Sequence, residues 1–176
     1  KKIFTLITAV AMGVAALSSC CNKQEDSKAK YIFLFIGDGM GASHIAVTES
    51  YLSAKAGKLG GEQLTMTQFP IYGTSTTHCE NKTITCSAAS GTAIASGHKT
   101  YYSRLGCDKD FNPLKSMAFP LKEEGYKIGI MSSVPITHAT PAAFYASTPD
   151  RGDGYGIMMQ IPDSGFDFFG GSGFED

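Results

Sequence analysis

The sequence predicts an α/β fold with a mainly parallel sheet, and three observations predict it. Segments of strand pattern alternate along the chain with segments of helical pattern, which is the order of βαβ units. The strongest strand candidate, Tyr31–Ile36, is a continuous apolar run followed by glycine, as expected of a strand buried on both faces. The composition, 43% hydrophobic and 18% charged over 176 residues, suits one globular domain with a core.

The other elements follow in order. After the first strand, helical spacing predicts a helix, and a β-branched alternating segment comes next. A helix of small residues follows, then a helical pattern that Pro120 weakens, and finally a second buried strand. The predicted ranges after Tyr31–Ile36 are Ala42–Ala54, Ile71–Thr77, Ser87–Ser96, Leu114–Glu124 and Tyr126–Met131.

The first residues are predicted to be an export signal. Two lysines precede Ile3–Leu17, an uncharged and mostly apolar run that is too short to span a bilayer comfortably. The run ends in Leu-Ser-Ser-Cys, which resembles a bacterial lipobox. We therefore expect a lipoprotein signal peptide over residues 1–19, acylation of Cys20, a polar tether over residues 20–29 and a domain over residues 30–176. The alternative is a simple signal peptide with incidental cysteines.

The expected location is the bacterial cell envelope, as a periplasmic or outer-membrane lipoprotein held to the membrane by its lipid. The formal net charge of -1 and the lack of a basic run give no basis for binding nucleic acid. No two of the five cysteines have C-x-x-C spacing, so a zinc ribbon is not predicted. No definite disulfide is predicted either.

Polar residues of the types that catalyse reactions or bind ligands follow the predicted strands. Asp38 lies in a Gly-Asp-Gly turn, Ser87 opens the small-residue helix, and His138, Thr140 and Arg151 follow the last strand. In open parallel sheets, ligands bind beyond the carboxyl ends of the strands. Each feature also has a simpler interpretation, namely a turn, a helix N-cap and a polar loop, respectively.

Taken together, these segments resemble the alkaline phosphatase family. The resemblance runs from about residue 30 to the end of the chain, and the order and spacing of its motifs are more specific than any one of them. It implies a three-layer α/β/α fold with a mainly parallel sheet, incomplete in this chain. The matching strings are residues 36–41 (IGDGMG), 87–90 (SAAS) with Thr92, Ala93 and Gly97, 139–143 (ATPAA) with Arg151 eleven residues after Thr140, and 166–171 (FDFFGG).

The resemblance also implies roles for individual residues. Asp38 would bridge a zinc site and the magnesium site, and Ser87 would be the nucleophile, a zinc ligand and the site of a phosphoserine. Thr140 would bind magnesium, and Arg151 would hold the phosphate. His138 occupies a position that varies between Asp and His in the family, so a magnesium role and a plain surface role both remain open. The implied cofactors are two Zn²⁺ and one Mg²⁺.

Two departures from the family pattern matter. The residue before the nucleophile is usually an Asp that fixes the arginine, and here it is Cys86. The family's remaining zinc ligands, an Asp-x-x-x-His pattern, an Asp-His pair and a final His, do not occur. We therefore expect this chain to be the N-terminal portion of a longer enzyme and to be inactive alone.

Two classes of function remain open. The first is metal-dependent hydrolysis of phosphate monoesters, and the second is a noncatalytic envelope lipoprotein that binds phosphate or a partner on a decayed scaffold. A related sulfatase or phosphodiesterase fits the Ser-Ala-Ala-Ser string with Arg151 less well. A homodimer is a possible assembly.

The lipobox hypothesis predicts that Cys20→Ser releases the protein from membranes or blocks its processing. Two or more acyl chains supply about 0.8 kcal/mol per buried methylene, which is enough for stable anchoring. The measurement is the distribution of wild-type and variant protein between membrane and soluble fractions, with Cys21→Ser as the matched control. An unchanged membrane fraction after Cys20→Ser would rule out the lipobox.

Overall fold

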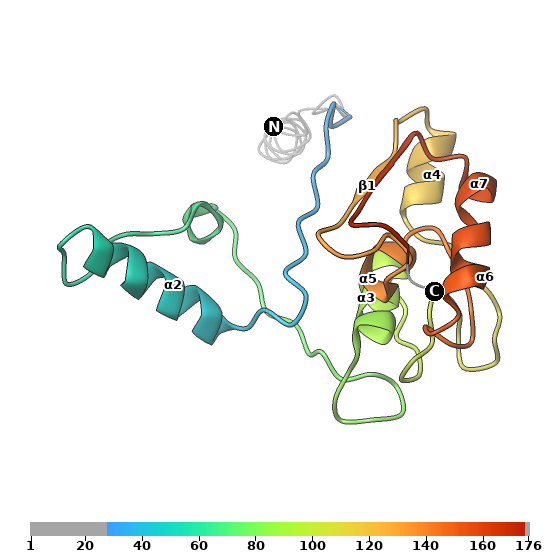
Figure 1. Ribbon diagram of the computed structural model, residues 1–176, viewed down its shortest axis with the longest axis horizontal. Helices are drawn as coiled ribbons and strands as arrows, with labels where there is room; N and C mark the ends of the chain where they lie inside the picture. The colour runs from blue at the N-terminus through green and yellow to red at the C-terminus, as the bar shows by residue number, and fades with distance from the viewer. Residues whose placement is uncertain (1–27, 175–176) are drawn as a thin grey trace, which may run out of the picture. The chain divides into compact units, whose positions relative to one another are not determined.

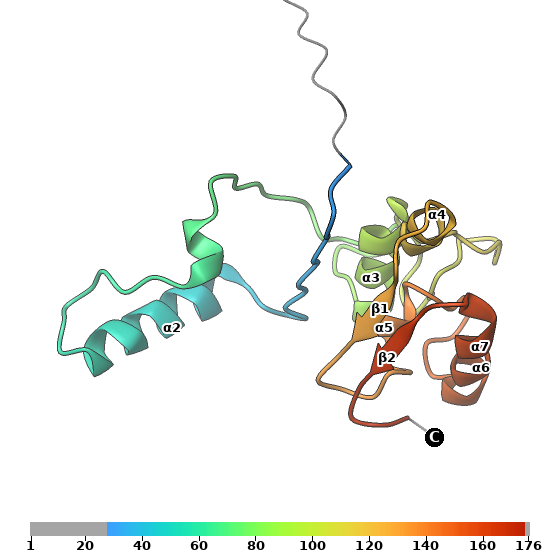
Figure 2. The ribbon, with the colours of Figure 1, turned by 90° about the horizontal axis from the view of Figure 1, so that it is seen from above.

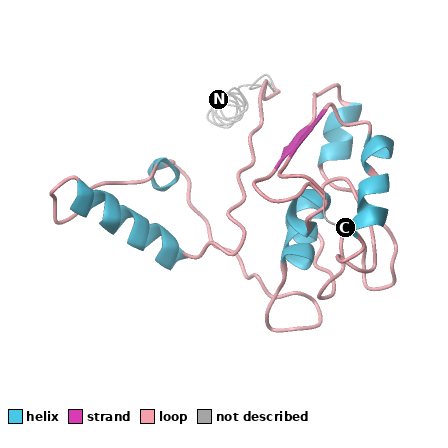
Figure 3. Cartoon of the chain, in the orientation of Figure 1, coloured by secondary structure: helices cyan, strands magenta, loops and turns pink. Residues whose placement is uncertain are grey.

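The structure is a computed structural model that describes residues 28–174. The chain divides after Ile36 into two compact units, and every helix and strand of the described residues lies in the second. Figure 3 shows that loops connect short helices over much of the chain. The elements are α2 (Ala42–Lys55), the 3-10 helix η2 (Thr65–Gln68), α3 (Ser87–Ser96), α4 (Ala118–Glu123), β1 (Gly129–Met131), α5 (Ala139–Ala142), α6 (Gly154–Met159), α7 (Ile161–Ser164) and β2 (Phe168–Gly170).

Helix α3 forms the centre of the core. The four alanines of α3 favour the helix, and Gly97 ends it in the left-handed conformation, with φ of 77°. One side of α3 packs against α5, as Figure 1 shows. A Cβ added at Gly91 would lie 3.1 Å from the Cβ of Ala143, so glycine permits this close approach. The buried side chains of the two helices are Ala88, Ala89, Thr92, Ala95, Ala139, Pro141 and Ala142.

Helix α4 is shorter than the predicted Leu114–Glu124 segment because it begins only at Ala118. Pro120 is the third residue of the helix. The N–H groups of the first turn have no partner within a helix, so a proline there removes no helical hydrogen bond. Pro120 is thus compatible with the helix, and the true start lies downstream of the predicted one.

The sheet is a parallel pair in which β1 lies beside β2, with Ile130 opposite Phe169 (Figure 2). Asp167 ties the two strands together where they begin. Its carboxylate accepts hydrogen bonds from the Ile128 N–H at 2.9 Å, Lys122 Nζ at 2.6 Å and Lys127 Nζ at 3.1 Å. This parallel pair agrees with the predicted α/β class. The predicted strand Tyr126–Met131 is formed only over its last three residues, which are β1.

Two predicted strands are not formed. Residues 31–36 and 71–77 have no strand assignment, and their large apolar side chains are exposed, with Phe35 88% and Ile71 88% accessible. A buried parallel strand needs hydrogen-bonding neighbours and covered faces. Within residues 28–174 the sheet contains only β1 and β2, so the intrinsic preference of these segments is not satisfied.

Helix α2 agrees with the predicted Ala42–Ala54 to within one residue. Glu49 on this helix holds the returning chain, because its Oε1 accepts hydrogen bonds from the Leu64 N–H at 3.0 Å and the Thr67 hydroxyl at 2.6 Å. These hydrogen bonds keep the pKa of Glu49 below its ordinary value. The segment that follows α2 is thus held to it by this carboxylate and by the Ser53 hydroxyl, which accepts the Glu62 N–H at 3.2 Å.

Several predictions concern residues outside the described part. The signal peptide over residues 1–19, acylation of Cys20 and most of the tether over residues 20–29 lie there and stay predictions. In the described part, no helix is both long enough and apolar enough to cross a bilayer. The three described cysteines, Cys79, Cys86 and Cys107, are free thiols, and Cys79 and Cys107 are buried.

Asp167→Asn is expected to lower the free energy of unfolding at neutral pH. The hydrogen bond from Lys122, followed by those from Ile128 and Lys127, holds the pKa of Asp167 far below its ordinary value. A depressed pKa in the folded state stabilises the fold above the unfolded-state pKa of about 4, and this stability is lost as the pH falls toward the folded-state pKa.

The measurement is denaturant unfolding of the wild type and Asp167→Asn between pH 3 and pH 7, with the exposed Asp163→Asn as control. The difference in stability between wild type and Asp167→Asn should be largest near neutral pH and should shrink below about pH 4. A difference that does not vary with pH would contradict this account of Asp167.

Candidate active site

The five predicted site residues gather around the carboxylate of Asp38. Asp38 Oδ2 accepts a hydrogen bond from the Thr140 hydroxyl at 2.8 Å, although the two residues are 102 positions apart. Ser87, His138 and Arg151 lie close to the same carboxylate. The fold therefore brings together every predicted site residue from Asp38 to Arg151.

Asp38 lies in a tight turn. The Met40 N–H donates to the Gly37 carbonyl at 3.0 Å, and Gly39 has φ of 67°, a left-handed conformation that favours glycine. The Gly-Asp-Gly pattern is thus a turn, as its simpler interpretation predicted. It is also the turn that places the carboxylate beside Ser87 and Thr140.

Ser87 is the first residue of α3 rather than its N-cap. The N-cap is Cys86, whose extended backbone accepts the first helical hydrogen bond, from the Ser90 N–H at 2.9 Å, and no side chain caps the helix. The N-cap interpretation of Ser87 is therefore wrong. The Ser87 side chain instead lies beside Asp38, at a helix end whose N–H groups and dipole favour a bound anion.

Arg151 is held at its main chain and at its side chain. Its N–H donates to the Ser103 carbonyl at 3.1 Å, and its Nη2 lies 3.2 Å from His138 Nε2. Because a guanidinium can only donate, the hydrogen-bonding pattern assigns the acceptor role to His138 Nε2 and the ring proton to Nδ1. That Nδ1 is buried and has no hydrogen-bond partner among the described residues.

The electrostatics of the site favour an ionised Asp38. Burial alone would raise the pKa of Asp38, but the hydrogen bond from Thr140, the nearby Ser87 hydroxyl and the positive charge of Arg151 hold it below its ordinary value. The carboxylate therefore remains charged near neutral pH. A charged oxygen ligand next to two hydroxyls is chemistry that suits a hard divalent cation.

The donor atoms fit magnesium better than zinc. Asp38, Thr140 and Ser87 present oxygen atoms, which Mg²⁺ prefers. Zinc sites in proteins need imidazole or thiolate ligands. Residues 28–174 contain no group of three or more His, Cys, Asp or Glu side chains that could hold a metal.

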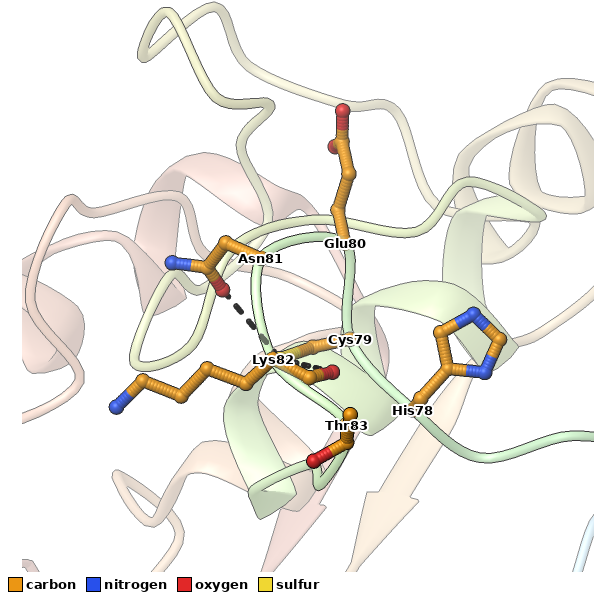
Figure 4. A pocket seen from close by; sticks show the side chains of 6 residues that line it. All are labelled: His78, Cys79, Glu80, Asn81, Lys82 and Thr83. Atoms are coloured by element: carbon orange, nitrogen blue, oxygen red, sulfur yellow. Dashed lines mark hydrogen bonds between the residues drawn. The ribbon is translucent and has the colours of Figure 1, made fainter.

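A shallow pocket elsewhere in the chain contains none of the predicted site residues. It is lined by residues 78–83, and Figure 4 shows that the side chains of His78, Glu80 and Lys82 point away from one another. Its contacts are structural, because Asn81 Oδ1 accepts the Tyr102 N–H at 2.9 Å. This loop joins the chain before α3 to the segment around Tyr102, which leads to Ser103.

Comparison with known proteins places these features in one family. A family model described as alkaline phosphatase matches residues 29–166. Alkaline phosphatase 4 of Bacillus subtilis (strain 168) is 35% identical over 149 residues, which cover 82% of this chain and 31% of that protein. The chain thus spans about a third of the length of this curated relative.

Two solved structures show the same similarity. The alkaline phosphatase from the Antarctic bacterium TAB5 has a TM-score of 0.69 and 35% identity, over 76% of this chain and 37% of that one. A variant of the TAB5 enzyme with Mg bound has a TM-score of 0.65 and 30% identity, over 76% of this chain and 36% of that one. The fold is therefore that of the alkaline phosphatases.

Thr140→Val is expected to raise the pKa of Asp38, because the ionised carboxylate loses a hydrogen bond that favours the charged form. The measurement is an NMR titration of the Asp38 carboxyl carbon in metal-free protein. Thr83→Val, in the exposed loop before α3, is the control and should leave the titration unchanged. An unshifted Asp38 titration in Thr140→Val would show that the hydrogen bond has no influence on the carboxylate.

Proposed function

Because the chain belongs to the alkaline phosphatase family, we propose that the protein containing it hydrolyses phosphate monoesters through a phosphoserine on Ser87. The observation that carries this proposal is the placement of Ser87 at the start of α3, beside Asp38 and in the same cluster as Arg151. The noncatalytic alternative would preserve packing and lose these polar side chains, and all of them are present.

The proposed reaction uses the charges that surround Ser87. The phosphoryl group binds with its oxygens toward the N–H groups at the start of α3 and toward the Arg151 guanidinium, which can donate two parallel hydrogen bonds. The Ser87 oxygen attacks phosphorus, the bond from phosphorus to the alcohol oxygen breaks, and a phosphoserine forms while the leaving alcohol oxygen takes up the proton that Ser87 releases. Water then attacks the same phosphorus and frees Ser87 and inorganic phosphate.

Asp38 orients the hydroxyl of Ser87 in this scheme. The lowered pKa of Asp38 makes its carboxylate a weak base, so its proposed role is to accept a hydrogen bond from the Ser87 hydroxyl and fix its direction, rather than to remove its proton. Magnesium held by Asp38 and Thr140 would add positive charge next to the transferring phosphoryl group. Two zinc ions are also proposed as cofactors, but the residues gathered here do not form a zinc ligand set.

Arg151 and its neighbours position the phosphate. The main chain of Arg151 is fixed by Ser103, and its guanidinium is oriented by His138 Nε2. A guanidinium that is already oriented loses less side-chain entropy when it binds phosphate. His138 is therefore proposed to position Arg151, in addition to any influence on the magnesium site.

Ser87→Ala in the complete protein is expected to lower hydrolysis of p-nitrophenyl phosphate by roughly 10³-fold or more, because the nucleophile is lost. Ser96→Ala, whose hydroxyl donates to the Thr92 carbonyl within the same helix, is the matched control and should keep its activity. The 176-residue chain alone should show no turnover above background. Full activity in Ser87→Ala would disprove the phosphoserine mechanism.

A further inference from the structure

Ser103 adopts an unusual backbone conformation beside the site. Its φ of 69° lies in the left-handed region, which disfavours residues other than glycine and asparagine. Ser103 and Phe111 are the two residues other than glycine with positive φ in the described part of the chain. Such a conformation persists only where neighbouring interactions determine it.

Two hydrogen bonds hold the Ser103 backbone from opposite sides. Its N–H donates to Cys86 Sγ at 3.2 Å, and its carbonyl accepts the Arg151 N–H at 3.1 Å. The contact between Ser103 and Arg151 continues along the chain. Leu105 and Thr148 donate their N–H groups to each other's carbonyls, at 3.1 Å and 2.8 Å. Residues 103–105 and 148–151 therefore form a short antiparallel pair whose end is fastened to Cys86.

Cys86 has two different contacts at the start of α3. Its carbonyl accepts the first hydrogen bond of the helix, from Ser90, while its side chain accepts the Ser103 N–H. The residue directly before the nucleophile thus touches both α3 and the segment that carries Arg151. A shift of either segment would stretch one of these contacts.

We propose that Cys86 is a positioning residue for Arg151, acting through the Ser103 backbone rather than through the guanidinium. The sulfur fixes the Ser103 N–H, the Ser103 carbonyl fixes the Arg151 main chain, and His138 orients the guanidinium. This inference rests on the proposed function, in which Arg151 binds the phosphoryl group. It gives the cysteine a function at the position where a carboxylate was expected.

Amide hydrogen exchange tests this linkage without using activity. The complete protein is compared with Cys86→Ala, with Cys86→Val, which fills the volume without an acceptor, and with Cys86→Ser, which restores an acceptor. Exchange of the Ser103 and Arg151 amides should be about tenfold faster or more in Cys86→Ala and Cys86→Val, and should return toward the wild-type rate in Cys86→Ser. Unchanged protection of the α3 amides shows that the variants are folded.

Cys79→Ala is the matched control, because it removes a sulfur that contacts Asn81, Lys82 and Ile84. It should leave the Arg151 amide unchanged. Wild-type protection of the Arg151 amide in Cys86→Ala and Cys86→Val would overturn the proposal. An equal loss of protection of the Arg151 amide in Cys79→Ala and in Cys86→Ala would also overturn the proposal.

Phosphate inhibition separates positioning from a loss of fold. In Cys86→Ala the inhibition constant for inorganic phosphate should rise about three- to tenfold while kcat changes less than about twofold, because Arg151 is less well placed. A purely structural role would lower kcat through loss of active protein and leave the inhibition constant unchanged, which would overturn the proposal. If the wild-type protein hydrolyses no phosphate ester, the proposed function fails, and the exchange measurement alone decides whether Cys86 holds Arg151.

Discussion

The close packing of α3 on α5 is the constraint on which the site depends. Ser87 opens one helix and Thr140 belongs to the other, so the separation of the two helices sets the distance between their side chains. Gly91 allows that separation, because even a methyl group there would press against Ala143. Interiors packed at this density transmit small changes in volume directly to neighbouring groups. A cavity or an added methyl group at this contact would therefore move the Ser87 and Thr140 hydroxyls relative to the Asp38 carboxylate.

The charges at the site complement one another in the absence of a ligand. Asp38 supplies a negative charge, while Arg151 and the start of α3 supply positive charge and N–H donors. His138 lies between them as an acceptor for the guanidinium. Because Arg151 has partners on its main chain and its side chain, its position does not depend on a carboxylate at residue 86. The replacement of the usual Asp by Cys86 is thus compatible with a fixed arginine.

Local patterns in the sequence predicted helices better than strands. Helices α2 and α3 were predicted almost to the residue, because small or helix-favouring residues and a terminal glycine act within each segment. The gathering of the candidate site residues around Asp38 could also be predicted, since their spacing matched a family, and their roles stay predictions. Tyr31–Ile36 was predicted as a strand and is not one, because a strand depends on partners that no local pattern reveals. The Ser103 backbone was missed, because a serine gives no sign of a left-handed conformation.

The exposed segment Tyr31–Ile36 also affects how the protein behaves in solution. Six consecutive apolar residues without charge, proline or glycine form the kind of sequence that pairs with identical copies into cross-β aggregates. Charged residues at the ends of such a segment oppose this pairing. Lys30, which lies over the Tyr31 ring at 5.5 Å, precedes the segment, and Asp38 is the first charge after it. A neutral replacement of Asp38 would therefore remove the first charge that opposes such pairing at this end of the segment, in addition to its contact with Thr140.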